Sequence, residues 1–399
     1  MLDSYRRVLA HPGAKRFTLA GLVARLPTSM VSLGIVLLVQ AQTGSYGLAG
    51  TVSAAYVLSQ AVAAVVHGRL LDTLGQSRVL PVAGLAFGAF LAATMLSVER
   101  SWPLAVTYLF AALAGASIPQ VGASVRTRWS HVLDNPRRVQ TAFALESVLD
   151  EVVFIVGPVL ATVLATAWHP VAGLSVALVS GVLGTLVLAA QRSTEPPAHR
   201  RVSAGDGAPM PWLVVGPLAL LFMSMGALFG AVEVTAVAFA EEQGSQGASG
   251  WLLAAWAFGS LVSGVVTGAI AWRRPPVTRL RLGIAALTAS MVPLPWVEGL
   301  VPMALVLAVG GIAIAPTLIA TMSVVEASVP APRLTEGLAL LHTGIVAGVA
   351  PGATVAGFVI DRSGSSPAFL VAVAAGVLGI ASAQLTRLAG RRQRSVAGH

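Results

Sequence analysis

The chain has 399 residues, of which 56% are hydrophobic and 10% are charged. A soluble globular protein carries about 25% charged residues, so this composition excludes a chain that is soluble over most of its length. The net charge of +9 does not indicate a nucleic-acid-binding protein, because the basic residues are dispersed over short loops. The absence of cysteine excludes disulfide bonds and thiolate metal sites.

Twelve apolar runs follow one another along the chain. Each is about long enough to cross the ~30 Å hydrocarbon core of a bilayer as a helix. They cover residues 17–41, 47–71, 79–98, 103–125, 139–167, 171–191, 212–240, 248–271, 279–297, 301–325, 334–361 and 366–388. We therefore predict an all-α integral membrane protein of twelve transmembrane helices.

The longest polar stretch, residues 192–211, separates the first six runs from the last six and is rich in Arg, Pro, Ser and Gly. It predicts a cytoplasmic linker between an N-terminal bundle, 1–191, and a C-terminal bundle, 212–399. Prolines recur in both halves: Pro316 follows Pro119 by 197 residues, and Pro332 follows Pro136 by 196. These nearly constant offsets indicate an internal duplication, as in many secondary transporters.

Basic residues lie almost entirely on alternate loops. Among the 25 Lys and Arg residues, Arg100 and Arg362 fall on the opposite side, and Arg25 lies inside the first run. Positive loops are retained in the cytoplasm. The pattern predicts a multi-pass protein of the inner (plasma) membrane with both termini and the linker in the cytoplasm.

The loop between the second and third runs, residues 68–78, has the sequence GRLLDTLGQSR. Gly68 and Gly75 permit a tight turn and close helix approach, and Asp72 favours a neighbouring helix N-terminus. With Arg78 close behind, the loop resembles the cytoplasmic loop motif of the major facilitator superfamily. The basic residues that this family carries within the loop are replaced here by polar ones.

The resemblance implies two pseudo-symmetric six-helix bundles and secondary active transport by alternating access, with a substrate site between the halves. It implies that the loop residues Gly68, Asp72, Gly75 and Arg78 form a cytoplasmic gate latch against helix 11. It also implies that helices 1 and 5 are neighbours, that helix 7 lines a central cavity, and that the protein works as a monomer.

Charged residues inside the membrane are costly unless paired or hydrated, so each is a candidate functional residue. Arg25 lies about eight residues into the first run, and the fifth run carries Glu146, Asp150 and Glu151. Glu146 and Asp150 share one helix face. We predict that Arg25 pairs with one of these two. Three acids and one Arg leave negative charge over, so a surplus carboxyl, with Asp150 the leading candidate, could carry a coupling proton. The alternative is a structural ion-pair cluster.

Two further ionisable groups lie in the second half. No basic residue there matches the depth of Glu233 in the seventh run, which predicts a role in binding a proton or a cationic substrate. The alternative is an interfacial group shared with Glu241 and Glu242. His342 in the eleventh run could titrate in the working range, or could be a hydrogen-bonded structural residue.

Polar and aromatic side chains complete a candidate substrate cavity, and they are Tyr56, Gln60, Gln120 and Trp256. Such groups bind an apolar or cationic organic molecule by packing and cation–π contact, although packing alone explains each one equally well. We find no pattern for a metal site, a cofactor or a catalytic group, and we expect a transporter rather than an enzyme.

The preferred function is proton-coupled export of a lipophilic drug or secondary metabolite. One alternative is proton-coupled uptake of a small polar metabolite such as a sugar or nucleoside. Another is a membrane sensor or lipid-handling protein of the same fold that does not transport a solute. The expected partners are a small-molecule substrate, protons and the lipid bilayer.

Overall fold

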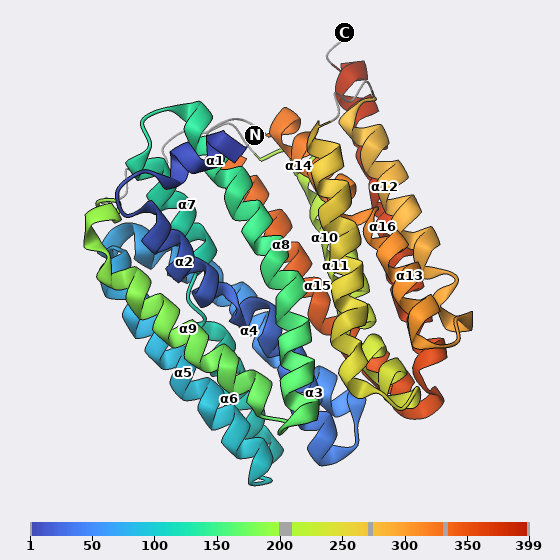
Figure 1. The fold of residues 1–399 in the computed structure, drawn as a ribbon. Coiled ribbons are helices and arrows are strands. Elements are labelled where there is room, and N and C mark those ends of the chain that lie inside the picture. The colour runs from blue at the N-terminus through green and yellow to red at the C-terminus, as the bar shows by residue number, and fades with distance from the viewer. Residues whose placement is uncertain (1, 199–209, 270–273, 330–333, 397–399) are drawn as a thin grey trace. The chain divides into compact units, whose positions relative to one another are not determined.

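The computed structural model of the protein describes residues 2–198, 210–269, 274–329 and 334–396, and within them every regular element is a helix (Figure 1). Twelve segments in this part of the chain are long and apolar enough to cross a membrane, which confirms the predicted number. Two segments differ clearly from their predictions: the fourth continues to Val132, and the eleventh begins at Thr343. The segments are Ala14–Thr43, Tyr46–Leu74, Gln76–Glu99, Leu104–Val132, Thr141–Ala167, Ala172–Ala190, Trp212–Glu242, Gln246–Thr267, Pro276–Trp296, Leu300–Ser328, Thr343–Ser363 and Ser365–Leu385.

The chain divides into two compact units. Unit 1 contains Met1–Gln42 and Ala55–Val202, and unit 2 contains Thr43–Ala54 and Ser203–His399. The helix α4 (Tyr46–Leu74) is shared, because its first turns belong to unit 2 and the rest to unit 1. The predicted N-terminal bundle, 1–191, included residues 43–54, which the structure places in unit 2.

The remaining helices of unit 1 are α1 (Leu2–Leu9), α2 (Ala14–Arg25), α3 (Pro27–Thr43), α5 (Gln76–Glu99), α6 (Leu104–Ser117), α7 (Val121–Val132), α8 (Pro136–Ala167), α9 (Ala172–Ala190) and the 3₁₀ turn η1 (Arg192–Thr194). Those of unit 2 are α10 (Trp212–Glu242), η2 (Gln246–Ala248), α11 (Ser249–Ala269), α12 (Pro276–Met291), η3 (Leu294–Trp296), α13 (Leu300–Gly311), α14 (Ile314–Ser328), α15 (Leu334–Ser363) and α16 (Ser365–Val396).

Several spans are broken, and two of the breaks lie at or near a proline. The first span breaks between α2 and α3 at Pro27, which has no N–H to donate to the preceding turn. The fourth breaks between α6 and α7 around Pro119, and the tenth breaks between α13 and α14. Breaks in both the fourth and the tenth spans are the arrangement expected of a duplicated half. The fifth and eleventh spans also match, because each contains a proline, Pro158 or Pro351, within a continuous helix.

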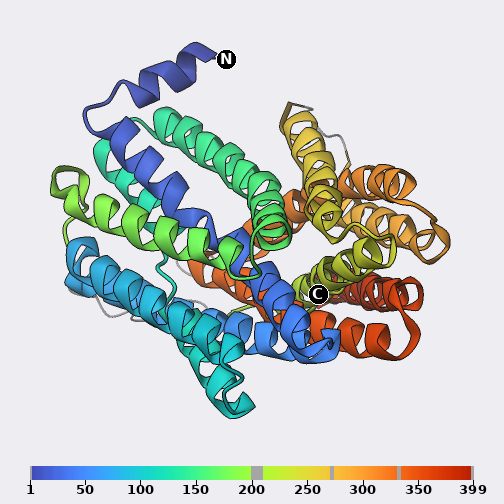
Figure 2. The same ribbon diagram turned by 60° about the horizontal axis from the view of Figure 1, so that its bottom comes forward.

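In unit 1, α2 lies between α8 and α9 (Figures 1 and 2). The helices α2 and α9 run antiparallel and approach closely, since a Cβ on Gly184 would meet the backbone nitrogen of Ala24 at 2.6 Å. Near the start of α2, the ring of Phe17 packs edge-on against Trp129 of α7, with ring centroids 4.6 Å apart. The ring contact fixes the start of α2, and the close approach at Gly184 fixes the end that carries Arg25.

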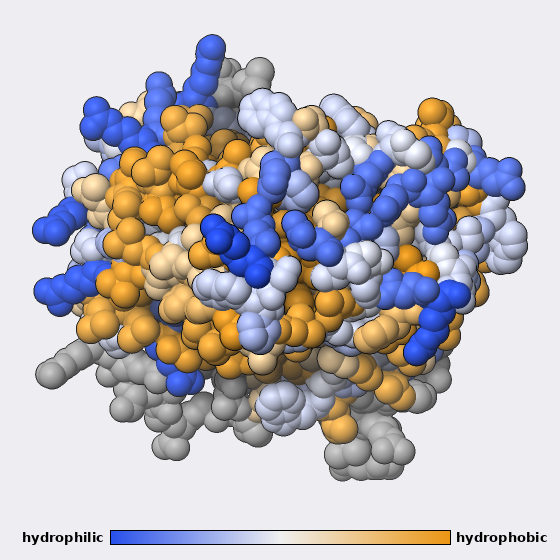
Figure 3. All heavy atoms as spheres, turned by 90° about the horizontal axis from the view of Figure 1, so that it is seen from below, coloured by the Kyte–Doolittle hydropathy of each residue, from blue (hydrophilic) through white to orange (hydrophobic). Residues whose placement is uncertain are grey.

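In unit 2, α10 packs along α15 and α16. Glycines mediate the α10–α15 contact, because a Cβ on Gly226, Gly230, Gly348 or Gly352 would overlap a carbonyl oxygen of the facing helix. Small residues allow this close approach in membranes, where lipid chains are as apolar as the helices. Large hydrophobic side chains are exposed along the helices. Figure 3 shows hydrophilic side chains between the hydrophobic ones on the face that it presents.

Candidate functional site

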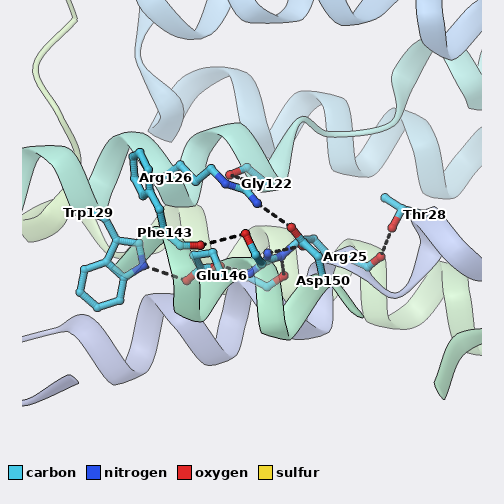
Figure 4. A network of polar contacts seen from close by, with 10 residues as sticks. Arg25, Thr28, Gly122, Arg126, Trp129, Phe143, Glu146 and Asp150 are labelled. Atoms are coloured by element: carbon cyan, nitrogen blue, oxygen red, sulfur yellow. Dashed lines mark hydrogen bonds and ion pairs between the residues drawn. The ribbon is translucent and has the colours of Figure 1, made fainter. Parts of the chain in front are cut away.

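Arg25 is the last residue of α2, directly before the break in the first span, and it is almost completely buried. Its Nε donates a hydrogen bond to the Gly21 carbonyl one turn earlier, at 3.0 Å. Its own carbonyl accepts from the Thr28 hydroxyl at 2.6 Å, beyond the break. These hydrogen bonds fix Arg25 at the break, and its guanidinium points toward α8 (Figure 4).

Two carboxylates on one face of α8 receive this guanidinium. Arg25 Nη1 lies 2.6 Å from Asp150 Oδ1, and Arg25 Nη2 forms an ion pair with Glu146 Oε2. The ion pair predicted from depth is therefore present, and it involves both acids. Glu146 is fully buried, and its Oε1 accepts a hydrogen bond from Trp129 Nε1 at 2.8 Å. A buried ion pair of this kind needs such extra hydrogen bonds to offset the loss of hydration.

A second Arg completes the network, and the sequence did not place it there. Arg126 Nη2 lies 2.6 Å from Asp150 Oδ2, and both side chains are about one-third exposed, at 34% and 30%. Arg126 lies one residue beyond the predicted fourth run, 103–125. The helix instead resumes at Val121 and carries Arg126 along the same span.

This second Arg corrects the expected charge balance. Arg25 and Arg126 neutralise Glu146 and Asp150, so these four residues leave no negative charge over. The remaining acid, Glu151, is half-buried and forms no hydrogen bond or ion pair with any residue that the structure describes. It therefore differs from Asp150, which two cations hold in place.

Two residues after Arg126, Arg128 anchors α7 to neighbouring segments. Its fully buried guanidinium donates to Gln76 Oε1 at 2.7 Å, to the Gln191 carbonyl at 2.8 Å and to the Thr194 hydroxyl at 3.0 Å. Gln76 also donates to the Ser124 carbonyl at 3.0 Å. Gln76 stands where the resembled family carries a basic residue, and the buried Arg128 explains why a neutral acceptor fits here.

The predicted loop 68–78 is helical apart from one residue, because α4 continues to Leu74 and α5 begins at Gln76. The chain turns at Gly75, whose φ of +86° lies in the region that favours glycine. The Ser77 N–H donates to Glu195 Oε1 at 2.8 Å, which ties the start of α5 to the segment after η1. Gly68 has open space around it, and Asp72 and Arg78 are exposed. Asp72 makes no hydrogen bond or ion pair within the described ranges. Its role as a gate latch stays a prediction.

The candidate cavity residues lie on separate elements. In unit 1, Tyr56 and Gln60 share a face of α4, and Gln120 lies in the break before α7. Tyr56 is buried, and its hydroxyl has no hydrogen-bond partner among the residues described, whereas Gln60 and Gln120 are half-buried. In unit 2, Trp256 is likewise buried with an Nε1 that lacks a partner in the described part of the chain.

Glu233 lies on α10, half-buried and in interaction with its surroundings, so the expectation of an isolated carboxylate is wrong. One turn earlier, Phe229 packs edge-on against Trp256, with ring centroids 5.3 Å apart. Glu241 and Glu242 lie at the end of α10, where they bind Tyr46 and Ser365, and Glu233 is two turns away from them. His342 lies in α15, and its side chain is outside the described residues.

Twelve apolar segments, several broken spans and a buried charge network characterise a polytopic helical membrane protein. Residues 17–310 match the Major Facilitator Superfamily, and the chain is therefore a member of that family. It is a multi-pass membrane protein, as its twelve apolar segments indicate.

A relative from Sinorhizobium fredii, the uncharacterized MFS-type transporter y4rN, is 30% identical over 176 residues, which are 43% of this chain and 42% of that protein. The match thus spans less than half of the relative.

Among solved structures, the human organic anion transporter MFSD10 (TETRAN) is 17% identical with a TM-score of 0.62, over 93% of this chain and 99% of that one. A bacterial homologue of the iron transporter ferroportin, in an inward-facing state, is 14% identical with a TM-score of 0.69, over 93% and 98%. The peptide transporter POT is 14% identical with a TM-score of 0.70, over 96% and 95%. These structures share the fold.

Proposed function

We propose that the protein exports a lipophilic drug or secondary metabolite across the inner membrane in exchange for protons. It works as a monomer by alternating access, with both termini in the cytoplasm. The basic loops support this topology, because positive charge is retained on the cytoplasmic side.

The carboxyl of Glu151 is the observation on which the proton coupling rests. An ionised carboxylate without a counter-charge is costly within the hydrocarbon region. Glu151 is the acid of the α8 cluster that no described cation pairs with, so binding a proton there brings the cluster to neutrality. We therefore assign the coupling proton to Glu151. The sequence favoured Asp150 instead, because of its depth in the fifth run.

The substrate class is supported by unit 2. Phe229 and Trp256 form an aromatic pair between α10 and α11, and Glu233 follows Phe229 by one helical turn. An aromatic surface next to a carboxylate favours a flat organic molecule or a cation over a sugar. Trp256 Nε1, which has no hydrogen-bond partner among the described residues, adds one donor for an acceptor on the substrate.

Dye accumulation in an efflux-deficient bacterial host tests this function. Cells that express the protein should accumulate less of a fluorescent lipophilic cation than cells with empty vector. Glu151→Gln should abolish the difference, because an amide cannot exchange a proton, and a protonophore should do the same. Glu233→Gln should weaken export of cationic dyes more than that of neutral ones.

Glu298→Gln is the matched control, because Glu298 is exposed in a loop and the substitution is chemically the same. It should export like the wild type. Wild-type expression in the membrane without any change in dye accumulation would contradict export of this substrate class. A Glu151→Gln protein that still responds to the protonophore would contradict the assignment of the proton.

A further inference from the structure

One carboxylate binds the N-terminal end of α4. Asp361, in the last turn of α15, accepts the Tyr46 N–H at Oδ1 over 2.7 Å and the Gly47 N–H at Oδ2 over 2.8 Å. Its Oδ2 also accepts the Ser45 hydroxyl at 2.6 Å. The first N–H groups of a helix have no partner within the helix and carry partial positive charge, so a carboxylate satisfies both needs.

The surrounding contact is close enough to require glycine. A Cβ on Gly357 of α15 would overlap the Tyr46 carbonyl, and a Cβ on Gly50 would lie 2.8 Å from the carbonyl oxygen of Ala353. The Tyr46 hydroxyl donates to Glu241 at the end of α10. The first turns of α4 are thus held by direct backbone packing and by two carboxylates of unit 2.

The division of the chain into two units indicates why this contact matters for function. Residues 43–54 belong to unit 2, whereas α4 continues into unit 1. These residues are joined to α15 by hydrogen bonds and packing alone, both of which can be broken and remade. Alternating access requires contacts of this kind at one face of a transporter.

We propose that Asp361 is a positioning residue of the transport cycle: it clamps the first turns of α4 to α15 and releases them when the outer face opens. This inference rests on the proposed function, which supplies the topology and the reason for release. The opposite end of α4 carries Asp72, exposed and without a hydrogen bond or ion pair in the described part of the chain. The helix α4 therefore has one acidic contact engaged at its outer end and one carboxylate free at its inner end, as expected if the two alternate.

Thiol labelling tests the clamp without a substrate, because the chain has no cysteine. Ser53→Cys places a thiol of similar size at a position that is 1% exposed in the clamped segment. A membrane-impermeant maleimide applied to intact cells should label it slowly. Adding Asp361→Asn should raise the labelling rate by about tenfold, the effect of losing charged hydrogen bonds that favour one of two conformations. Ser45→Ala removes one of the three hydrogen bonds to Asp361, together with the bond from the Leu48 N–H to the Ser45 hydroxyl, and should produce a smaller rise.

Glu242→Gln is the matched control. Glu242 binds the N–H of Ser365 at 2.8 Å at the start of α16, so it caps a helix that takes no part in the clamp. It should leave the labelling rate unchanged. Equal labelling rates in Asp361→Asn, Ser45→Ala and the parent would overturn the proposal, as would an equal rise in Glu242→Gln. Because labelling needs no substrate, a failed dye assay would leave this result intact and would contradict only the proposed function.

Discussion

Arg25 is the residue on which the buried network depends, because Glu146 has no other cation in contact among the described side chains. Arg25→Gln should lower the free energy of unfolding by about 3–5 kcal/mol, since it leaves a buried carboxylate without its counter-charge. Glu146→Gln in the same chain should recover most of the loss. Arg126→Gln, at a side chain that is 34% exposed, should cost less than about 1 kcal/mol because solvent screens the pair. Unfolding by SDS in mixed micelles measures all four proteins, and a double variant no more stable than Arg25→Gln would contradict this account.

At the same scale, the sequence predicted the partners of Arg25 and missed two others. Matching depth on two spans was enough to predict Glu146 or Asp150 as the partner of Arg25, because a charged side chain inside the membrane needs a counter-charge or water. Arg126 and Trp129 were missed because the basic residues from Arg126 onward resembled the loop after a span. A signal was present: residues 121–132 keep bulky apolar residues, Val125, Trp129 and Val132, at helical spacing.

At the scale of elements, the α10–α15 contact should be the most sensitive to added bulk. Gly348→Ala would force a Cβ into the Met223 carbonyl, and backbone atoms cannot rotate away, so we expect a loss of about 1–3 kcal/mol. Gly216→Ala on α10 is the matched control, because nothing lies within 4 Å of its added Cβ. It should be neutral or gain up to about 1 kcal/mol from helix propensity. The same micelle titration compares the two, and equal stability would show that the close helix approach is not required.

The elements themselves were largely predictable, and their breaks were only partly so. Hydrophobic length predicted twelve spans, whereas the interruptions near Pro27 and Pro119 were not predicted, although a proline lies at each. The tenth span breaks after Gly310 and Gly311, before Pro316, and apolar composition alone hides such a break. The membership of residues 43–54 in unit 2 depends on Asp361 and Glu241, which lie far along the chain, so no local pattern reveals it.

For the whole molecule, the basic loops lead to a test of orientation. Alkaline phosphatase fused after residue 399 should be inactive, because it folds only outside the cytoplasm, and a green fluorescent protein at the same site should fluoresce. Phosphatase inserted in the loop at Gly299, between η3 and α13, should be active. The reverse pattern would contradict the proposed topology and would move the Asp361 contact to the inner face.

The clamp at the start of α4 also constrains how the protein is made. Tyr46 and Asp361 are separated by 315 residues, so the start of α4 leaves the ribosome long before Asp361 is synthesised. At 5–20 residues per second, synthesis alone imposes a wait of roughly 15–60 s. Throughout that interval the N–H groups of Tyr46 and Gly47 must be satisfied by water or by lipid headgroups. The first turns of α4 therefore reach their final position only after α15 has entered the membrane, which makes one of the earliest helices to be synthesised one of the last to be finished.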